Sequence, residues 1–205
     1  MRVPLLCFDN FYKDPDKIRD YALGLWYGKP FTGFYPGLRS DPLHEINPEY
    51  FNIMCDKFMS LLTQAHWKGT ILTQFQRIPN DSVTSGLVHN DGGDAVCAGV
   101  VYLNPDPTPG SGTSFFKAPT NVVDFEGDDY PTSEESMVQY NSQFKKTIEV
   151  DNVYNRVILY DAQEWHAHTN SYMEREDRLT QVFFINSLSL QNDTLTFERC
   201  NSYDL

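Results

Sequence analysis

The sequence predicts a mainly β fold, a sandwich or a barrel, with flanking helices at its N-terminal end. After residue 69 the chain consists of short β-rich runs separated by Gly- and Pro-rich turns, and no helical pattern alternates with them as in βαβ units. Before residue 69 it carries two amphipathic helical patterns. Its 205 residues suffice for one sizeable core and fall short of two comfortable domains, so we expect a single domain over 1–205.

Residues 1–68 are expected to form a first strand and two supporting helices. The apolar run VPLLCF at 3–8 predicts the strand. Asp14 and Pro15 are typical of an N-cap and a first helical position, and the helix that they start should stop at the Gly-Lys-Pro run 28–30.

The second helix is predicted to follow a Gly/Pro-rich loop over 30–45. Asn47 and Pro48 begin it by the same device as the first helix. Its apolar stripe repeats at helical spacing and consists of Phe51, Met54, Cys55, Phe58, Leu61 and Leu62. Each of the two helices therefore needs an apolar surface to pack against.

Residues 69–190 are expected to form the β core. Five runs predict its strands: 70–78, 95–104, 113–117, 155–160 and 178–186. The segment 126–146 is polar and acidic, and Thr132 with Glu135 matches a capping box, so part of it is expected to be helical. We interpret this segment as an insertion or lid and not as a second domain.

Charge and apolar content argue against several partners. A net charge of −12 disfavours nucleic acid and anionic membranes, because both need a basic surface. No apolar run approaches the roughly 20 residues of a membrane span, and the N-terminal run lacks the pattern of a signal peptide. The cysteines lie far apart without a C-x-x-C pair, and each sits in or beside an apolar run, which predicts buried free thiols and a cytoplasmic protein; the four are Cys7, Cys55, Cys97 and Cys200.

The stretch SGLVHNDGGD at 85–94 places His89 and Asp91 two residues apart. In an extended strand the two side chains share a face. An imidazole beside a carboxylate makes half of a metal site. Taken alone, the pair fits equally well with two solvated polar residues beside a turn, so a third ligand is needed to decide.

Two further histidines, His166 and His168, follow a predicted strand, whereas His44 and His66 read as surface residues. If either His166 or His168 lines the same cavity as His89, the set becomes two histidines and one carboxylate. Non-haem iron(II) oxygenases use this set and keep other coordination positions open. Zinc could take the same ligands, usually in a tetrahedral site.

Arg178 and Thr180 lie on one face of the last predicted strand, by its period of two. A guanidinium beside a hydroxyl is suited to hold a carboxylate, since the arginine can give two charge-assisted hydrogen bonds. A structural salt bridge is the alternative interpretation of Arg178.

The order of these motifs resembles that of the iron(II)- and 2-oxoglutarate-dependent dioxygenases, most closely the prolyl-4-hydroxylase-like group. The resemblance covers roughly 70–186 and rests on HND (89–91), VVYLNPD (100–106), GSGTSFF (110–116), ILYDAQEWH (158–166) and RLT (178–180). It implies a double-stranded β-helix (jelly roll) that the N-terminal helices buttress.

The resemblance also implies roles for particular residues. His89 and Asp91 match the proximal metal ligands. His166 is favoured as the distal ligand by its distance from the preceding strand, and His168 is the alternative by its spacing to the arginine. Arg178, Thr180 and Tyr102 match residues that hold the carboxylate of 2-oxoglutarate.

One position departs from the group. Relatives often carry a tyrosine on the strand before the H-x-D motif, where this chain has Ile78, which leaves Gln74 or Gln76 to take its place.

The expected activity is hydroxylation of a C–H bond with Fe(II), 2-oxoglutarate and O2, releasing succinate and CO2. The intact carboxylate of Asp91 argues for hydroxylation over halogenation, while desaturation and ring closure stay open. The substrate is a peptidyl proline, another residue or a small molecule, and Tyr35 and Arg39 are candidate contacts. The alternatives are a cupin-like or zinc enzyme without 2-oxoglutarate, and a non-catalytic β-sandwich binding module.

Overall fold

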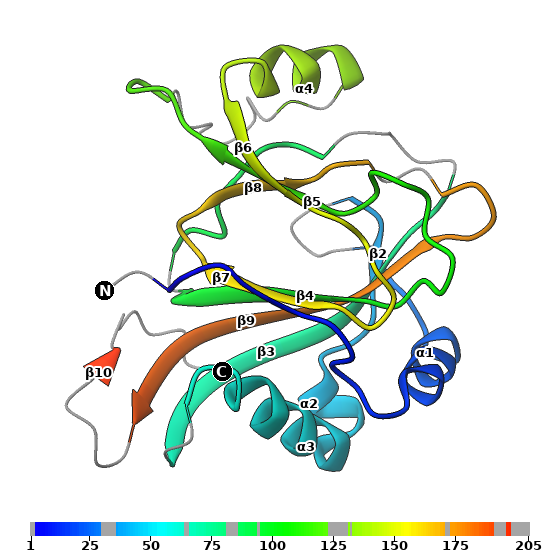
Figure 1. Cartoon of the computed structure of the whole chain (residues 1–205). Helices are drawn as coiled ribbons and strands as arrows, with labels where there is room; N and C mark the ends of the chain where they lie inside the picture. The colour runs from blue at the N-terminus through cyan, green and yellow to red at the C-terminus, as the bar shows by residue number, and fades with distance from the viewer. Residues whose placement is uncertain are drawn as a thin grey trace.

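The computed structural model describes residues 3–29, 36–63, 66–80, 86–93, 95–122, 131, 133–170, 173–190 and 196–197. Two antiparallel sheets make up most of it (Figure 1). The large sheet has seven strands, in the order β1 (Leu6–Phe8), β7 (Val157–Asp161), β4 (Cys97–Tyr102), β9 (Arg178–Leu190), β3 (Trp67–Ile78) and β2 (Leu38–Arg39), with β10 (Thr196–Phe197) paired to β9. The small sheet has the order β6 (Lys145–Val150), β5 (Thr113–Lys117) and β8 (Trp165–His168). The prediction of a jelly-roll-like, mainly β fold is confirmed.

Three helices lie against the large sheet: α1 (Pro15–Leu23), α2 (Leu43–Ile46) and α3 (Pro48–Met59) (Figure 1). The predicted N-caps are confirmed, since Asp14 accepts a hydrogen bond from the Lys17 N–H and Asn47 accepts one from the Tyr50 N–H. The predicted stop of the first helix at 28–30 is wrong. Gly24 ends α1 one turn earlier by donating its N–H to carbonyls of the last turn.

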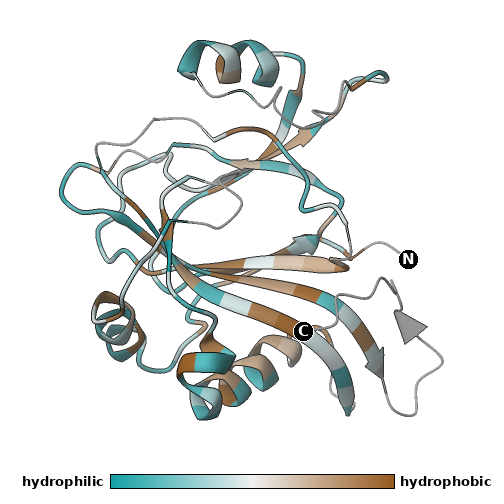
Figure 2. Cartoon of the chain, turned by 180° about the vertical axis from the view of Figure 1, so that it is seen from behind, coloured by the Kyte–Doolittle hydropathy of each residue, from teal (hydrophilic) through white to brown (hydrophobic). Residues whose placement is uncertain are grey.

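The main core lies between these helices and the outer face of the large sheet. Phe58 of α3 stacks on Phe183 of β9 at 4.1 Å between ring centroids. In Figure 2 the strands of this sheet are largely brown, and the helices alternate between brown and teal, as amphipathic helices should. A second cluster, which includes Tyr102, Phe115 and Tyr160, fills the space between the two sheets. The inner faces of the sheets therefore enclose the region where the polar motifs meet.

The five predicted strands are all present, as β3, β4, β5, β7 and β9. The predicted loop over 30–45 is wrong in its described part, which contains β2 and α2. The described part of the segment 126–146 contains the helix α4 (Glu134–Asn141), as expected, and then enters β6, which the polar sequence did not predict.

Two smaller expectations need correction. The capping box of α4 is formed by Ser133 and Ser136, whose hydroxyls and N–H groups pair reciprocally, and Thr132 lies outside the described residues. Cys55 and Cys97 are buried free thiols as expected, but Cys7 is an exposed one because β1 is an edge strand. Among the described residues, no helix has the length and apolar character that a membrane crossing requires.

Candidate metal centre and its cavity

His89 and His166 are held opposite each other by their backbones. They form an isolated antiparallel bridge, in which the His89 N–H donates to the His166 carbonyl at 3.0 Å and the reverse bond is 2.8 Å. Residues that face each other across such a pair project their side chains to the same side. The bridge therefore places two imidazoles together, with ring centroids 4.5 Å apart.

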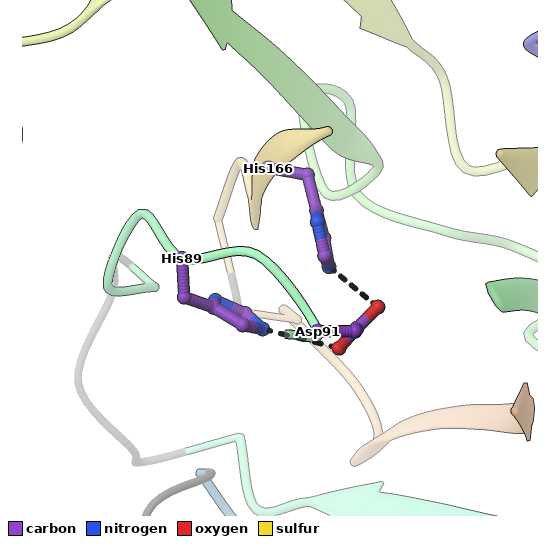
Figure 3. A group of neighbouring side chains, drawn as sticks. All are labelled: His89, Asp91 and His166. Atoms are coloured by element: carbon purple, nitrogen blue, oxygen red, sulfur yellow. Dashed lines mark ion pairs between the residues drawn. The ribbon is translucent and has the colours of Figure 1, made fainter. Parts of the chain in front are cut away.

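Asp91 completes a group with these histidines (Figure 3). Its N–H donates to the carbonyl of Ala162 at 2.8 Å, which anchors the loop after His89 beside the turn before His166. The Nε2 atoms of His89 and His166 lie 3.7 Å and 3.5 Å from the two carboxylate oxygens of Asp91. One ligand atom from each of the three residues lies within 4.8 Å of the others, a spacing at which a metal ion could bind all three.

The hydrogen bonds of the two rings fix which nitrogens face the group. The Nδ1 atom of His89 lies 2.9 Å from the carbonyl of Leu87, and that of His166 lies 2.9 Å from the carbonyl of Glu164. A carbonyl only accepts, so each Nδ1 carries the proton and each Nε2 presents a lone pair. This is the arrangement in which histidines bind metals, with the second nitrogen tied to an acceptor.

Burial leaves His166 neutral and one carboxylate oxygen of Asp91 without a described donor, and both conditions favour binding of a cation. Desolvation lowers the pKa of His166 to about 4 against the opposing pull of Asp91, so the ring is neutral at pH 7. Among the described residues, Oδ2 of Asp91 is buried and has no hydrogen-bond donor. A buried carboxylate oxygen without a donor is costly. A bound divalent cation would satisfy this oxygen and both Nε2 lone pairs, so the donor set fits a metal.

The three residues line a cavity of about 80 Å³ between the two sheets. Its wall also includes alternate residues of β9, which bring Arg178, Thr180, Val182 and Phe184 to one face. The remaining lining residues are Pro36, Arg39, Gln76, Ile78, Val100, Thr113, Tyr160 and His168. The structure thus brings the predicted metal ligands and the predicted carboxylate-binding pair to one space.

Arg178 is buried at the base of this wall. Its Nε–H donates to the carbonyl of Ser111 at 3.1 Å, and its guanidinium lies 5.6 Å from the centroid of the Tyr102 ring. Burial lowers the pKa of this arginine from its usual value. Among the described residues no carboxylate lies within ion-pair distance of it, so the salt-bridge interpretation finds no support there. The hydroxyl of Thr180 is likewise buried without a partner in the described chain.

Tyr102 does not line the cavity. Its hydroxyl donates to Oγ1 of Thr113 at 2.7 Å, and its ring supports Arg178 from beneath. The tyrosine that does line the cavity is Tyr160 of β7, whose hydroxyl lies 3.1 Å from Nε2 of His166. Sequence reasoning missed it, although its position six residues before His166 in ILYDAQEWH was the available signal.

His168 lies in the same cavity but outside the three-residue group. It shares a face of β8 with His166, and burial, reinforced by the charge of Arg178, lowers its pKa to about 3. Its Nε2 has no partner among the described residues. Ile78, at the position where relatives often have tyrosine, lines the cavity, while the amides of Gln74 and Gln76 donate to the backbone of Ser40 and Pro36.

The comparisons with solved structures show what this chain is similar to. HygX from Streptomyces hygroscopicus, with nickel and 2-oxoglutarate bound, superposes with a TM-score of 0.60 at 15% identity, over 89% of this chain and 82% of that one. HygX has also been solved with hygromycin B bound.

Two prolyl hydroxylases have the same fold. The prolyl-4-hydroxylase of Pseudomonas putida matches with a TM-score of 0.54 at 14% identity, over 89% of this chain and 91% of that one. The prolyl hydroxylase of Trichoplax adhaerens, in complex with a peptide of hypoxia inducible factor, matches with a TM-score of 0.54 at 13% identity, over 89% of this chain and 84% of that one.

No curated protein matches the sequence. A family model does, over residues 1–185. The chain has the fold of the prolyl-hydroxylase-like 2-oxoglutarate oxygenases, and it belongs to the family of unknown function DUF6445.

Proposed function

We propose that this protein is an iron(II)- and 2-oxoglutarate-dependent oxygenase that hydroxylates a C–H bond of its substrate and releases succinate and CO2. The observation that carries the proposal is the content of one cavity. Two lone-pair imidazole nitrogens and a carboxylate oxygen without a donor face it, together with a buried arginine that has no acidic partner in the described chain. The group of two histidines and an aspartate needs a cation, which iron(II) would supply. The buried arginine lacks an acidic partner among the described residues, and the carboxylate of 2-oxoglutarate would supply one.

His89, Asp91 and His166 would hold the iron. Two neutral ligands and one carboxylate leave part of the coordination sphere of iron(II) open, as oxygenases of this class require. Bound iron supplies the activation of O2 and the oxidative decarboxylation of 2-oxoglutarate that the protein's own groups cannot perform. The carbonyls of Leu87 and Glu164 orient the rings for it through Nδ1, and these two hydrogen bonds would persist, whereas the Tyr160 hydroxyl would give up Nε2 of His166 to the metal.

Arg178 and Thr180 would orient 2-oxoglutarate by its far carboxylate. Burial strengthens a charge-assisted pair, because the surrounding low dielectric screens it little. The carbonyl of Ser111 and the ring of Tyr102 hold the guanidinium in place before the ligand arrives. His168, neutral and beside Arg178, lies where it can accept or donate a hydrogen bond to a ligand in the cavity.

The two alternatives make different demands on these residues. A zinc or cupin-like enzyme without 2-oxoglutarate has no use for Arg178 and Thr180. A non-catalytic module has no use for two oriented imidazoles beside an unsatisfied carboxylate. The burial of these polar groups without partners, at a cost to stability, favours the oxygenase.

Anaerobic reconstitution with Fe(II) and 2-oxoglutarate tests the proposal. We expect a weak visible charge-transfer band from the keto acid bound to iron. The band should be absent in His89→Ala and Asp91→Ala and should need more 2-oxoglutarate in Arg178→Ala. His66→Ala, which removes an exposed histidine, serves as the matched control and should keep the band. A folded wild-type protein without the band contradicts the proposal.

A further inference from the structure

We propose that the indole of Trp26 is a stacking surface for a ring of the substrate, at the rim of the cavity. The inference rests on the proposed function and names a chemical feature of the compound that the same site accepts. Trp26 lies between α1 and β2 and is exposed. A single exposed apolar side chain is not by itself evidence of a site. The position of this one relative to the cavity wall carries the inference.

One row of paired residues leads from the buried wall of the cavity to the segment of Trp26. Thr180 of β9 lies opposite Gln76 of β3, and Gln76 lies opposite Arg39 of β2. Arg39 in turn exchanges two backbone hydrogen bonds with Gly28, at 2.9 and 3.0 Å. Residues opposite each other in antiparallel strands project to the same side. The whole row therefore faces the cavity, and its first three members do line it.

The indole of Trp26 occupies the place where Gly28 would carry a side chain. A Cβ on Gly28 would lie 2.4 Å from Cη2 of the indole and 2.7 Å from Cζ3. Glycine is needed here because any side chain would push the ring away. The ring therefore continues the row beyond Arg39, on the face that the cavity occupies.

Exposure increases along this row. Thr180 is fully buried, Gln76 is 8% exposed, Arg39 is half-buried and Trp26 is 71% exposed. The row thus runs from the site proposed for 2-oxoglutarate to the surface. Of the two candidate substrate contacts predicted from the sequence, Arg39 lines the cavity, and Tyr35 lies outside the described residues.

The cavity is too small to enclose a whole substrate beside the cosubstrate. Its volume is about 80 Å³, whereas pockets that bury most of a drug-sized ligand start at about 300 Å³. With 2-oxoglutarate bound, the remaining space suits the reacting carbon and its neighbours. The rest of a substrate must lie on the rim, where the indole offers an exposed aromatic face.

The segment that carries the indole is held on both sides. The N–H of Leu25 donates to the carbonyl of Ala22 at 3.2 Å, and the hydroxyl of Tyr27 donates to the same carbonyl at 2.9 Å. On the other side, Gly28 is held by its two bonds to Arg39. An indole fixed in this way offers a flat apolar face at small entropic cost, which suits the face of an aromatic or a saturated ring.

Ring compounds and open-chain counterparts test the inference on the anaerobic Fe(II)–2-oxoglutarate protein. The panel pairs N-acetylprolinamide with N-acetylvalinamide, methyl glucoside with sorbitol, and N-acetylphenylalaninamide with N-acetylleucinamide. Binding is followed by ligand-observed NMR and by the protection of tryptophan fluorescence from acrylamide. Trp67 and Trp165 are half-buried, so the quenchable fluorescence is mainly that of Trp26. We expect at least one ring compound to bind about 5-fold or more tightly than its counterpart, the gain typical of one stacking contact.

Four variants assign that preference to the indole. Trp26→Ala should abolish both the preference and the protection from acrylamide, while the 2-oxoglutarate titration of the band stays that of the wild type. Trp26→Phe should keep part of the preference. Gly28→Ala should weaken it with the tryptophan still present, because the added Cβ displaces the indole. Ile53→Ala, which removes an exposed apolar side chain of α3, is the matched control and should keep it.

The outcomes separate this inference from the proposed function, with thermal melting as the check that each variant is folded. A wild-type protein that shows the band but binds no ring compound better than its counterpart overturns the role of Trp26. So does a Trp26→Ala protein that keeps the preference, or one whose only change is a lower oligomeric state in sedimentation velocity, which would make the indole a contact between copies. A wild-type protein without the band overturns the proposed function and this inference with it. The three arms of the panel decide which kind of ring the site accepts.

Discussion

His89 and His166 exchange both of their backbone hydrogen bonds, so the loop after β3 and the strand β8 are fixed in register at the metal group. A slip of one residue on either side would turn one imidazole away from the cavity, because neighbouring side chains in an extended chain point to opposite faces. The positions of the two histidines are therefore set by backbone pairing. Asp91 is held beside them by the hydrogen bond from its N–H to the carbonyl of Ala162, in the turn between β7 and β8.

Asp91→Ala should separate metal binding from folding. The change removes a buried carboxylate oxygen without a described donor, so the metal-free variant should melt at or above the temperature of the metal-free wild type. Saturating Ni(II) should raise the melting temperature of the wild type, by the free energy of binding to the folded state, and leave that of the variant unchanged. A metal-induced shift of equal size in both proteins contradicts the proposed ligand set.

Arg178→Gln should weaken 2-oxoglutarate and spare the metal. Loss of one charged partner in a buried site costs about 2 kcal/mol, or roughly 30-fold in affinity. Titration of the charge-transfer band with 2-oxoglutarate measures this, with Mn(II) binding as the readout for the metal. Arg77→Gln, which breaks a partly exposed ion pair with Asp177, the residue just before β9, is the control and should titrate like the wild type.

Tyr102→Phe should change the stability of the fold, whereas Tyr160→Phe should change the properties of the site. Tyr102 donates to Thr113 within the core, so its variant should lose about 1 kcal/mol of unfolding free energy and keep its 2-oxoglutarate affinity within about 2-fold. Tyr160 lines the cavity beside His166, so its variant should change the charge-transfer band or the rate of succinate release. Urea unfolding and coupled turnover assays compare the two. If Tyr102→Phe alone raised the 2-oxoglutarate requirement, Tyr102 would be a direct contact.

Gly112→Ala should be severely destabilising. A Cβ at this position would lie 1.8 Å from the carbonyl oxygen of Val150, at the point where the chain enters β5 beside β6. The backbone must shift to accept it, and we expect a loss of about 3 kcal/mol or more in urea unfolding. Gly24→Ala, where the nearest atoms lie at 3.5 and 3.6 Å, is the matched control and should be close to neutral. Equal stability of both variants contradicts the close approach of these strands.

The metal-free protein should lose stability as the pH falls below 6.5. Burial lowers the pKa of His166 to about 4 and that of His168 to about 3 in the folded state, so only the unfolded chain takes up these protons near pH 6.5. The stabilisation is complete above 6.5 and declines toward pH 4, by up to about 1.4 kcal/mol per pH unit for each histidine. Urea unfolding in a chelator at pH 7.0, 6.0 and 5.0 measures the slope. His168→Gln should reduce the slope, and His66→Gln, at an exposed position, should not.

Much of the fold could be predicted because local signals and tertiary packing agree. The Asp14-Pro15 and Asn47-Pro48 starts of α1 and α3 depend on capping alone, and the strands β3, β4, β5, β7 and β9 carry apolar runs between turns. The strand β6 was missed since Lys145–Val150 is polar and exposed apart from its last residue, so it pairs without an apolar pattern. The strand β2 was missed because two residues held by neighbouring amides leave no periodicity to read.

The order of the motifs along the chain was enough to predict five residues of the site. His89, Asp91, His166, Arg178 and Thr180 do line one cavity. The sequence could not say which tyrosine lines it, because Tyr102 and Tyr160 both end apolar runs and both lie in the cluster between the sheets. They differ in the partner of the hydroxyl, which is Thr113 for Tyr102 and His166 for Tyr160. Nor could the sequence place Gln74 and Gln76, whose partners lie in a segment far away in the sequence.

The strand β9 belongs to both layers of the molecule. Thr180 and Val182 face the cavity, while Gln181 between them accepts a 2.6 Å hydrogen bond from the hydroxyl of Tyr12, which precedes α1. The N-terminal third therefore contributes a hydrogen bond to the strand that forms the cavity wall. Removal of this N-terminal third would leave Oε1 of Gln181 buried without its Tyr12 donor, directly beside Thr180, which is proposed to help hold 2-oxoglutarate. A shortened chain that keeps every motif should therefore still bind 2-oxoglutarate poorly.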